Sequence, residues 1–202
     1  MNISGRAKVI FATSSATLGD YSNHANRTLA IVDAGGLNIA SGGFLDMGDN
    51  SMILKYVAAN KAATDTMIQS LLTSASDIGG WDGTTGIGSS EATFDAAGQA
   101  ARAVGWADQN DVGDVSFEGD TADVADGNEI MIKFTYTGDT DLSGTVDATD
   151  SANFSLGLHG LGNGGNAGWE FGDFDYSGGK PNSNDSQAFS LGLHAYRQFG
   201  AL

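Results

Sequence analysis

The residues best suited to chemistry lie in an acidic, glycine-punctuated loop over residues 139–150, DTDLSGTVDATD. Oxygen-bearing side chains stand at loop positions 1, 3, 5, 9 and 12, and Gly144 stands at position 6. Calcium takes six to eight oxygen ligands at about 2.3–2.6 Å, and twelve-residue calcium loops present them at this spacing. The glycine permits the sharp turn that brings the second half of the loop back to the ion. The predicted calcium ligands are Asp139, Asp141, Ser143, the backbone carbonyl of Thr145, Asp147 (often through water) and Asp150.

A second loop over residues 173–185, DFDYSGGKPNSND, repeats this pattern with one residue inserted. The insertion lies among Gly179, Lys180 and Pro181, a stretch that can bulge outward. We therefore expect two calcium ions, the second held more weakly because its loop has only three acids and a nearby lysine. The alternative is a pair of ordinary acidic turns. The predicted ligands of the second loop are Asp173, Asp175, Ser177, Gly179, Asn182 in place of Asp147, and Asp185.

Both loops belong to a duplicated module. Residues 150–159, DSANFSLGLH, recur 35 residues later as residues 185–194, DSQAFSLGLH. Each copy predicts a helix that Asp150 or its counterpart caps. Gly157 and Gly192 predict close approach of the two helices, since glycine otherwise costs about 1 kcal/mol relative to alanine. His159 and His194 favour bonding to helix-end carbonyls over binding a transition metal. The predicted shared core consists of Phe154, Leu158, Phe189 and Leu193, with Trp169 covering one end.

Residues 138–202 resemble a dockerin, a duplicated EF-hand-like calcium loop and helix found in secreted bacterial proteins. The motifs GDTDLSGTVDATD and GDFDYSGGKPNSND carry the resemblance, which covers about a third of the chain. Serine at loop position 5 in both copies and the inserted residue depart from the family pattern. The resemblance implies a protein partner: a cohesin-like domain, a cell-surface component or copies of the chain itself. The contacts it implies are Ala148, Thr149, Ser183 and Asn184.

Residues 28–56 show a period of eight, with Leu29, Leu37, Leu45 and Ile53 separated by turn signals. This pattern predicts four short strands. A small antiparallel sheet is favoured, and the last coils of a β-solenoid are the alternative. Residues 28–137 are similar, less specifically, to the β-rich regions that precede dockerins in large bacterial surface proteins.

Three further segments complete the expected elements. Residues 64–75 predict a helix capped by Thr64 or Asp65, and residues 95–106 a second one weakened by glycines. Residues 129–137, EIMIKFTYT, alternate as a strand does. Between them, Trp81, Ile87 and Phe94 are expected to anchor a loop in the core. The fold class is therefore α+β: a Gly-rich β-sheet domain over 1–137 with one or two helices, then a small helical dockerin-like calcium module over 138–202.

Composition limits the partners. The 202 residues include 9 Lys plus Arg, 25 Asp plus Glu and no cysteine, for a net charge of −16. This charge disfavours nucleic acid and anionic membranes, and the absence of cysteine excludes disulfides, iron–sulfur clusters and cysteine-based zinc sites. Residues 1–16 do not form a good secretion signal because the apolar run after Lys8 is too short. The acidic, Gly-rich, cysteine-free composition nevertheless favours an extracellular or cell-surface protein.

No catalytic motif is found. The sequence lacks GxSxG, HExxH, a P-loop and a GxGxxG preceded by a strand. His24 has no neighbouring constellation, and acidic pairs such as Asp108 with Asp111 and Asp123 with Asp126 are expected on solvated faces. We therefore expect a non-enzymatic, calcium-binding attachment or docking protein. The alternatives are a self-assembling subunit of a surface layer or filament, and part of a carbohydrate-active hydrolase.

Overall fold

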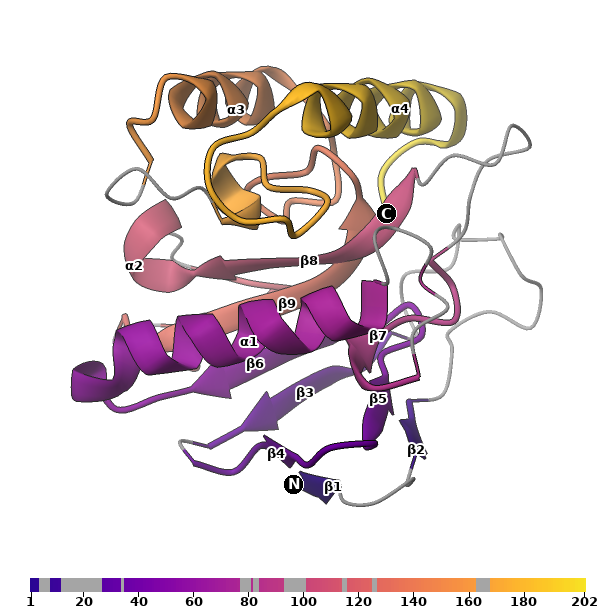
Figure 1. The fold of residues 1–202 in the computed structure, drawn as a ribbon. Helices are drawn as coiled ribbons and strands as arrows, with labels where there is room; N and C mark the ends of the chain where they lie inside the picture. Colours follow the sequence, from indigo (N-terminus) through magenta and orange to yellow (C-terminus); the bar gives the residue numbers. More distant parts are fainter. Residues whose placement is uncertain are drawn as a thin grey trace.

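Three small sheets and four α-helices make up the described part of the chain in the computed structural model (Figure 1). It is an α+β protein, as expected from the sequence. Helix α1 lies against the sheets, and helices α3 and α4 lie beyond strand β8 on the other side (Figure 1). The structure describes residues 1–3, 8–11, 27–33, 35–76, 81, 84–92, 101–113, 116–124, 127–162 and 168–202.

The largest sheet has the strand order β3-β6-β9-β8, with bounds Leu29–Val32, Ser51–Lys55, Glu129–Tyr136 and Arg102–Asp108. Strands β3 and β6 are parallel, whereas β9 runs antiparallel to both β6 and β8. All eight residues of β9 are buried, so both of its faces are covered. The predicted strand is confirmed at the centre of the sheet.

The four period-eight strands exist as β3, β4 (Asn38–Ile39), β5 (Phe44–Asp46) and β6, but the predicted antiparallel sheet is wrong. Strand β4 pairs in parallel with β1 (Asn2–Ile3), and β5 with β2 (Lys8–Ile10) and β7 (Gly86–Gly88). Within the described residues the sheets form neither a closed barrel nor a solenoid. Apolar alternation identifies a strand and its buried face, but it does not select which distant backbone edge pairs with it.

Helix α1 (Lys61–Ser76) follows a short 3-10 helix η2 (Ala58–Asn60) and begins earlier than predicted. Thr64 and Asp65 therefore lie inside the helix and are not its caps. The Thr64 hydroxyl donates to the Asn60 carbonyl at 2.9 Å. Ile68 and Leu72 are fully buried against the sheets, as the apolar face predicted.

The predicted second helix is wrong over residues 102–106, which lie in β8; residues 93–100 lie outside the described residues. Pairing of β8 with β9 along seven residues overrides the local helical tendency. Asp108 then caps the short helix α2 (Gln109–Val112). Ile87 is buried and Trp81 is half-buried, as expected of anchors, and Phe94 lies outside the described part.

An aromatic cluster joins α3 (Ala148–Leu158), the 3-10 helix η4 (Trp169–Phe171) and α4 (Ser183–Phe199). Phe154 stacks on Phe189 with ring centroids 5.1 Å apart, and the fully buried Trp169 meets Phe174 edge-on. These contacts confirm most of the predicted core. Leu158 is an exception, because its side chain is 44% exposed.

The same cluster continues into the large sheet. The Tyr176 hydroxyl donates to the Val104 carbonyl of β8, and a Cβ built on Gly105 would lie 2.6 Å from Trp169 Nε1. Residues from both sides of position 138 therefore share one core. The division into domains at that position stays a prediction. Among the described residues, no helix combines the length and apolar character needed to cross a membrane.

The two repeated helix glycines allow close backbone contact, but not with each other's helix. A Cβ on Gly157 would lie 1.8 Å from the Phe171 carbonyl oxygen, and one on Gly192 would lie 1.5 Å from the Thr137 carbonyl oxygen. The predicted close approach is confirmed, and the predicted partner is wrong. The two helices instead pack closely against the backbone of η4 and of the residue after β9.

We predict that Gly192→Ala destabilises the protein although alanine is the better helix former. The methyl group would overlap the Thr137 carbonyl, and overpacking of this kind costs about 1–3 kcal/mol. Urea unfolding of Gly192→Ala is compared with Ser190→Ala, an exposed change on the same helix expected to be neutral or slightly stabilising. A gain in stability for Gly192→Ala would contradict the close contact.

Candidate metal centres

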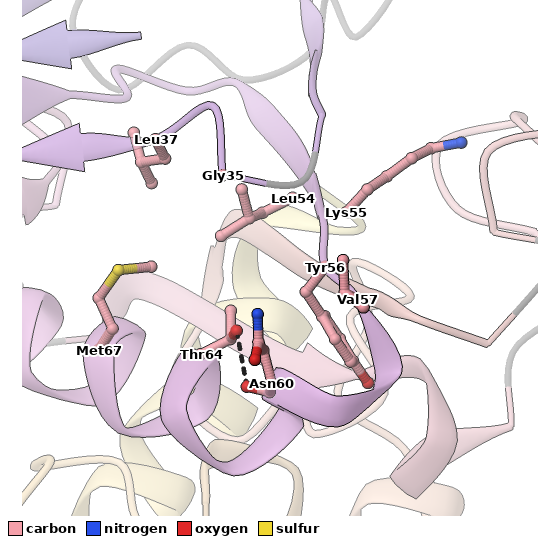
Figure 2. A pocket seen from close by; sticks show the side chains of 9 residues that line it. All are labelled: Gly35, Leu37, Leu54, Lys55, Tyr56, Val57, Asn60, Thr64 and Met67. Carbon is pink, nitrogen blue, oxygen red and sulfur yellow. Dashed lines mark hydrogen bonds between the residues drawn. The ribbon is translucent and has the colours of Figure 1, made fainter.

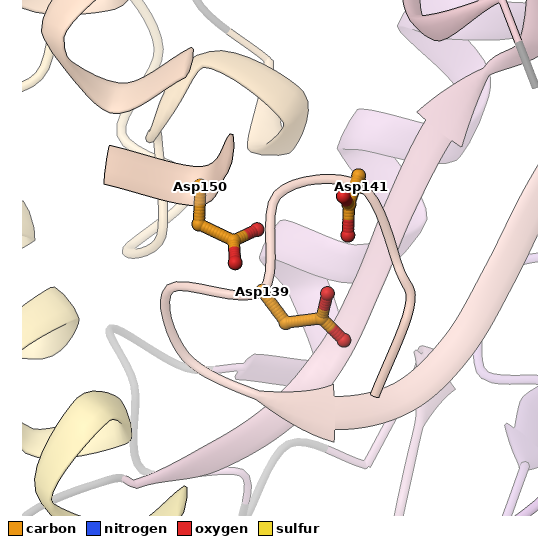
Figure 3. A group of neighbouring side chains, drawn as sticks. All are labelled: Asp139, Asp141 and Asp150. Carbon is orange, nitrogen blue, oxygen red and sulfur yellow. The ribbon is translucent and has the colours of Figure 1, made fainter. Parts of the chain in front are cut away.

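Two groups of three aspartates converge at the ends of the repeated helices. In the first, Asp139 and Asp141 come from the loop after β9 and Asp150 from the first turn of α3 (Figure 3). Each contributes a carboxylate oxygen, and these oxygens all lie within 4.8 Å of one another. Asp173, Asp175 and Asp185 form the second group by the same criterion. The structure thus brings together loop positions 1, 3 and the closing acid in both copies.

Both oxygens of each closing aspartate are held by backbone N–H groups. Asp150 Oδ1 accepts from Thr140 N and Oδ2 from Asp147 N, each at 2.7 Å. In the second copy, Asp185 accepts from Phe174 N at 2.9 Å and from Asn182 N at 2.8 Å. These bonds fix the closing carboxylate with respect to both the start of the loop and the start of the helix.

The first aspartate of each loop accepts a bond from the glycine five residues later. Gly144 N donates to Asp139 Oδ2 at 2.8 Å, and Gly178 N donates to Asp173 Oδ2 at 3.1 Å. Both glycines have positive φ, 86° and 77°, so the expected sharp turn at loop position 6 is confirmed.

Asp139 is fully buried, and its Oδ1 has no hydrogen-bond partner. A buried carboxylate oxygen without a partner is costly, whereas buried carboxylates that coordinate a metal ion are satisfied. A side chain that lies close to two other carboxylates thus carries an oxygen atom without a partner. This atom is available as a ligand for a cation.

The helix-capping role falls to Asp147, not to Asp150 as predicted. Helix α3 begins at Ala148, so the Asp147 side chain accepts from Thr149 N at 2.8 Å while Asp150, in the third helical position, completes a capping box. Asn182 and Asp185 repeat this arrangement at α4. The side chain of Asp147 lies outside the first aspartate group. The calcium-ligand roles of six further residues stay predictions: Ser143, Thr145, Asp147, Ser177, Gly179 and Asn182.

Burial disfavours ionisation at both centres. It raises the pKa of Asp173 to about 7, with the charges of Asp185 and Asp175 adding to the effect. Burial also raises the pKa of Asp139 well above its ordinary value, partly offset by the Lys133 ammonium. Such oxygen-only clusters suit hard divalent cations, whose charge compensates carboxylates held close together.

The second centre is tied to helix α1 by a residue that the sequence did not indicate. Gln69 Nε2 donates to Asp173 Oδ2 at 2.9 Å, and Gln69 Oε1 accepts from Trp106 Nε1 at 3.2 Å. At the first centre, Trp169 Nε1 donates to the Asp139 carbonyl at 2.7 Å. Gln69 lies 104 residues from its aspartate, so no local spacing could have identified it.

The other candidate acids serve ion pairs and caps. Asp108 and Asp111 both contact Lys61 Nζ, at 3.3 and 2.9 Å, and Asp123 pairs with Lys55 at 2.6 Å. Asp108 is buried, which contradicts the expectation that it lies on a solvated face. His24 and Asp126 lie outside the described residues. His159 Nδ1 contacts the Ser155 carbonyl at 2.7 Å, as expected for a helix-end histidine.

A pocket of about 270 Å³ lies between β6 and the start of α1 (Figure 2). Leu37, Leu54 and Met67 supply apolar surface. Its Tyr56 hydroxyl donates to Asp108 Oδ2 at 2.7 Å, and its Lys55 is paired with an aspartate. The polar groups there are thus engaged in structural contacts.

Comparison with known proteins gives no match: no family model, no curated protein and no solved structure is significantly similar to the chain. The functional argument therefore depends on the geometry of the two aspartate groups.

We predict that acidification stabilises the metal-free protein. The pKa values of Asp139, Asp150, Asp173 and Asp185 are raised, so the folded state binds more protons than the unfolded chain between about pH 4 and pH 7. Stability in EDTA should rise from pH 7.5 to pH 5.5, with Asp173, whose pKa is about 7, contributing on the order of 1 kcal/mol. Thermal unfolding measures this, and Asp173→Asn should reduce the slope. A loss of stability over this interval would contradict the raised values.

Proposed function

We propose that residues 138–202 form a dockerin-like interaction module that binds two calcium ions and attaches the protein, outside the cell, to a protein partner. The observation that carries the proposal is the pair of matched aspartate groups with the buried, unpartnered Oδ1 of Asp139. Calcium is favoured over magnesium because a loop rich in carboxylate and carbonyl oxygens can supply six to eight ligands. Magnesium instead demands octahedral geometry and retains water.

Calcium would order the module because each closing aspartate both lies in an aspartate group and hydrogen-bonds to the backbone. Asp150 and Asp185 lie in the metal groups and also bond the backbone at the start of α3 and α4. Without a cation, three carboxylates within reach of one another repel or take up protons. Filling the sites therefore favours the same loop and helix geometry that the module needs for recognition.

The surface around the helix starts supports a role in binding a protein. Ala148 and Thr149 of α3 are exposed, and so are their counterparts Ser183 and Asn184 of α4. Further along, Leu156, Leu158 and Leu161 are 42%, 44% and 71% exposed. Exposed leucines on and beside a helix otherwise surrounded by polar residues are typical of an interaction surface.

Self-assembly is the second candidate function, and one observation favours it. Strands β1, β2 and β3 are each at the edge of their sheet, and Ile10 of β2 and Ile31 of β3 are 61% and 45% exposed. Edge strands with exposed apolar side chains can pair with another chain. In this alternative the chain is itself the structural subunit, and calcium stiffens it.

We predict that the protein binds two calcium ions, and that Asp139→Asn and Asp173→Asn each remove one. Each change replaces a carboxylate ligand by a weaker neutral one at a buried position. Isothermal titration calorimetry gives the stoichiometry, with Asp33→Asn, an exposed acid far from both loops in sequence, as the charge-matched control. Wild-type protein that binds no calcium at millimolar concentration would rule out the proposal.

We further predict that calcium-loaded protein is a compact monomer that binds a cohesin domain, and that EDTA abolishes binding. Light scattering with calcium and with EDTA, followed by titration with a panel of cohesin domains, measures this. Exchanging Ala148, Thr149, Ser183 and Asn184 for arginine together should abolish binding without changing calcium stoichiometry.

Regular polymers that dissociate in EDTA would favour the structural subunit. Turnover of a polysaccharide would favour the hydrolase, provided that mutation of an aspartate outside the two loops abolishes it.

A further inference from the structure

We propose that a cleft between helix α1 and the second calcium loop binds an organic cation, namely a primary ammonium group on an aliphatic stem. The cleft has a volume of about 550 Å³, within the range of small-molecule sites. Helix α1 forms one wall, and residues around η4 and loop two form the other. Its lining includes Asp65, Gln69, Trp106, Glu170, Gly178 and Gly179.

Glu170 is the residue that points to a ligand. Glu170 lines the cleft, yet it is only 1% exposed and its Oε2 has no hydrogen-bond partner. The carboxyl group lies over Gly168, where a Cβ would approach Oε2 to 2.4 Å. A buried carboxylate is costly unless it is paired, so this group is a ready acceptor for a cation.

Asp65 adds a second acceptor on the opposite wall. Its Oδ2 bonds to Lys61 Nζ at 3.0 Å, whereas its buried Oδ1 has no partner. Lys61 also contacts Asp108 and Asp111, so a single ammonium group serves three carboxylates. Negative charge therefore exceeds positive charge beside the cleft, in a chain whose net charge is already −16.

The pKa of Glu170 agrees with this excess of negative charge. Its pKa is raised to about 8, chiefly by burial; the charges of Asp111 and Asp65 contribute to the rise, and Lys61 partly offsets it. A bound cation would reverse that balance by favouring the ionised carboxylate. Binding should therefore strengthen as the pH rises through about 8, so it is measured at pH 9, where Glu170 is mostly ionised and an alkylammonium group, with a pKa of about 10.4, keeps its charge.

An organic cation suits the lining better than a metal ion does. Among the described residues, groups of three converging metal-ligating side chains occur only in the two calcium loops, and neither Asp65 nor Glu170 belongs to one. The volume far exceeds that of a single ion. Trp106 supplies aromatic surface, to which ammonium groups are attracted, and the two glycines of loop two leave room for an aliphatic stem.

The cleft is distinct from the calcium sites although it adjoins one of them. The Gln69 amide nitrogen donates to Asp173 and its amide oxygen accepts from Trp106. These two bonds hold the Gln69 side chain between the cleft and the second aspartate group. Because the acceptors are different carboxylates, cation binding is tested with calcium at saturation. A failure here would leave the calcium proposal unaffected.

The test is isothermal titration calorimetry of the calcium-loaded protein with two probes, cadaverine and Nα-acetyl-lysine methylamide. We expect a dissociation constant below about 10 mM for at least one probe, and no heat from the neutral analogue Nα-acetyl-norleucine methylamide. Binding of cadaverine alone would identify free amines as the ligand source. Binding of the lysine derivative would identify a basic side chain of a protein.

Glu170→Gln should weaken binding at least about tenfold. The substitution removes a charge-assisted hydrogen bond, and the free energy of such a bond corresponds to about that change in affinity. Thr66→Arg, at an exposed rim position, should block the cleft without altering a buried residue, and Asp33→Asn should bind as wild type. Equal binding of the norleucine analogue, or unchanged affinity in Glu170→Gln, would overturn the proposal. So would a third calcium ion that is lost in Glu170→Gln, because the cleft would then be a metal site.

Discussion

Two closing aspartates hold the C-terminal module together, and the rest of the site follows from their bonds. Asp150 and Asp185 each accept one backbone N–H from the start of the loop and one from the residue before the helix. A single carboxylate therefore sets where the loop closes, where the helix begins and where the other two acids must lie. Because the duplicated copies repeat these bonds with nearly the same lengths, the arrangement is a property of the repeat and not of one loop.

The C-terminal module packs directly on the large sheet, in addition to following it in the chain. Trp169 fits beside Gly105 of β8 and bonds the carbonyl of Asp139, while Tyr176 bonds β8 directly. Gln69 reaches the second aspartate group from helix α1. A change in either aspartate group would thus disturb contacts on which the packing of the N-terminal part also depends. Conversely, the sheet restrains the carboxylates and keeps them buried, which is why their pKa values are raised.

Sequence spacing was a good guide wherever one short segment determines the outcome. Both acidic loops converge as their spacing predicted, Gly144 takes the left-handed conformation, and residues 129–136 form a buried strand. Prediction from sequence spacing failed where the alternatives differ by less than one helical turn, or where a distant strand decides between them. The cap moved from Asp150 to Asp147 because the capping-box geometry places the acid in the third helical position. Residues 102–106 became a strand because β9 offers them a full edge.

The sequence by itself determined the convergence of three aspartates in each loop and the short strands, because each depends on residues within about a dozen positions of one another. Only the tertiary structure decided which strands pair, that the glycines of α3 and α4 approach η4 and the end of β9, and that Asp139 keeps an unpartnered oxygen. It alone brought Asp65 and Glu170 to one cleft. The physical reason is that burial and charge excess are sums over neighbours far apart in the chain, whereas turns and caps are set by the local backbone.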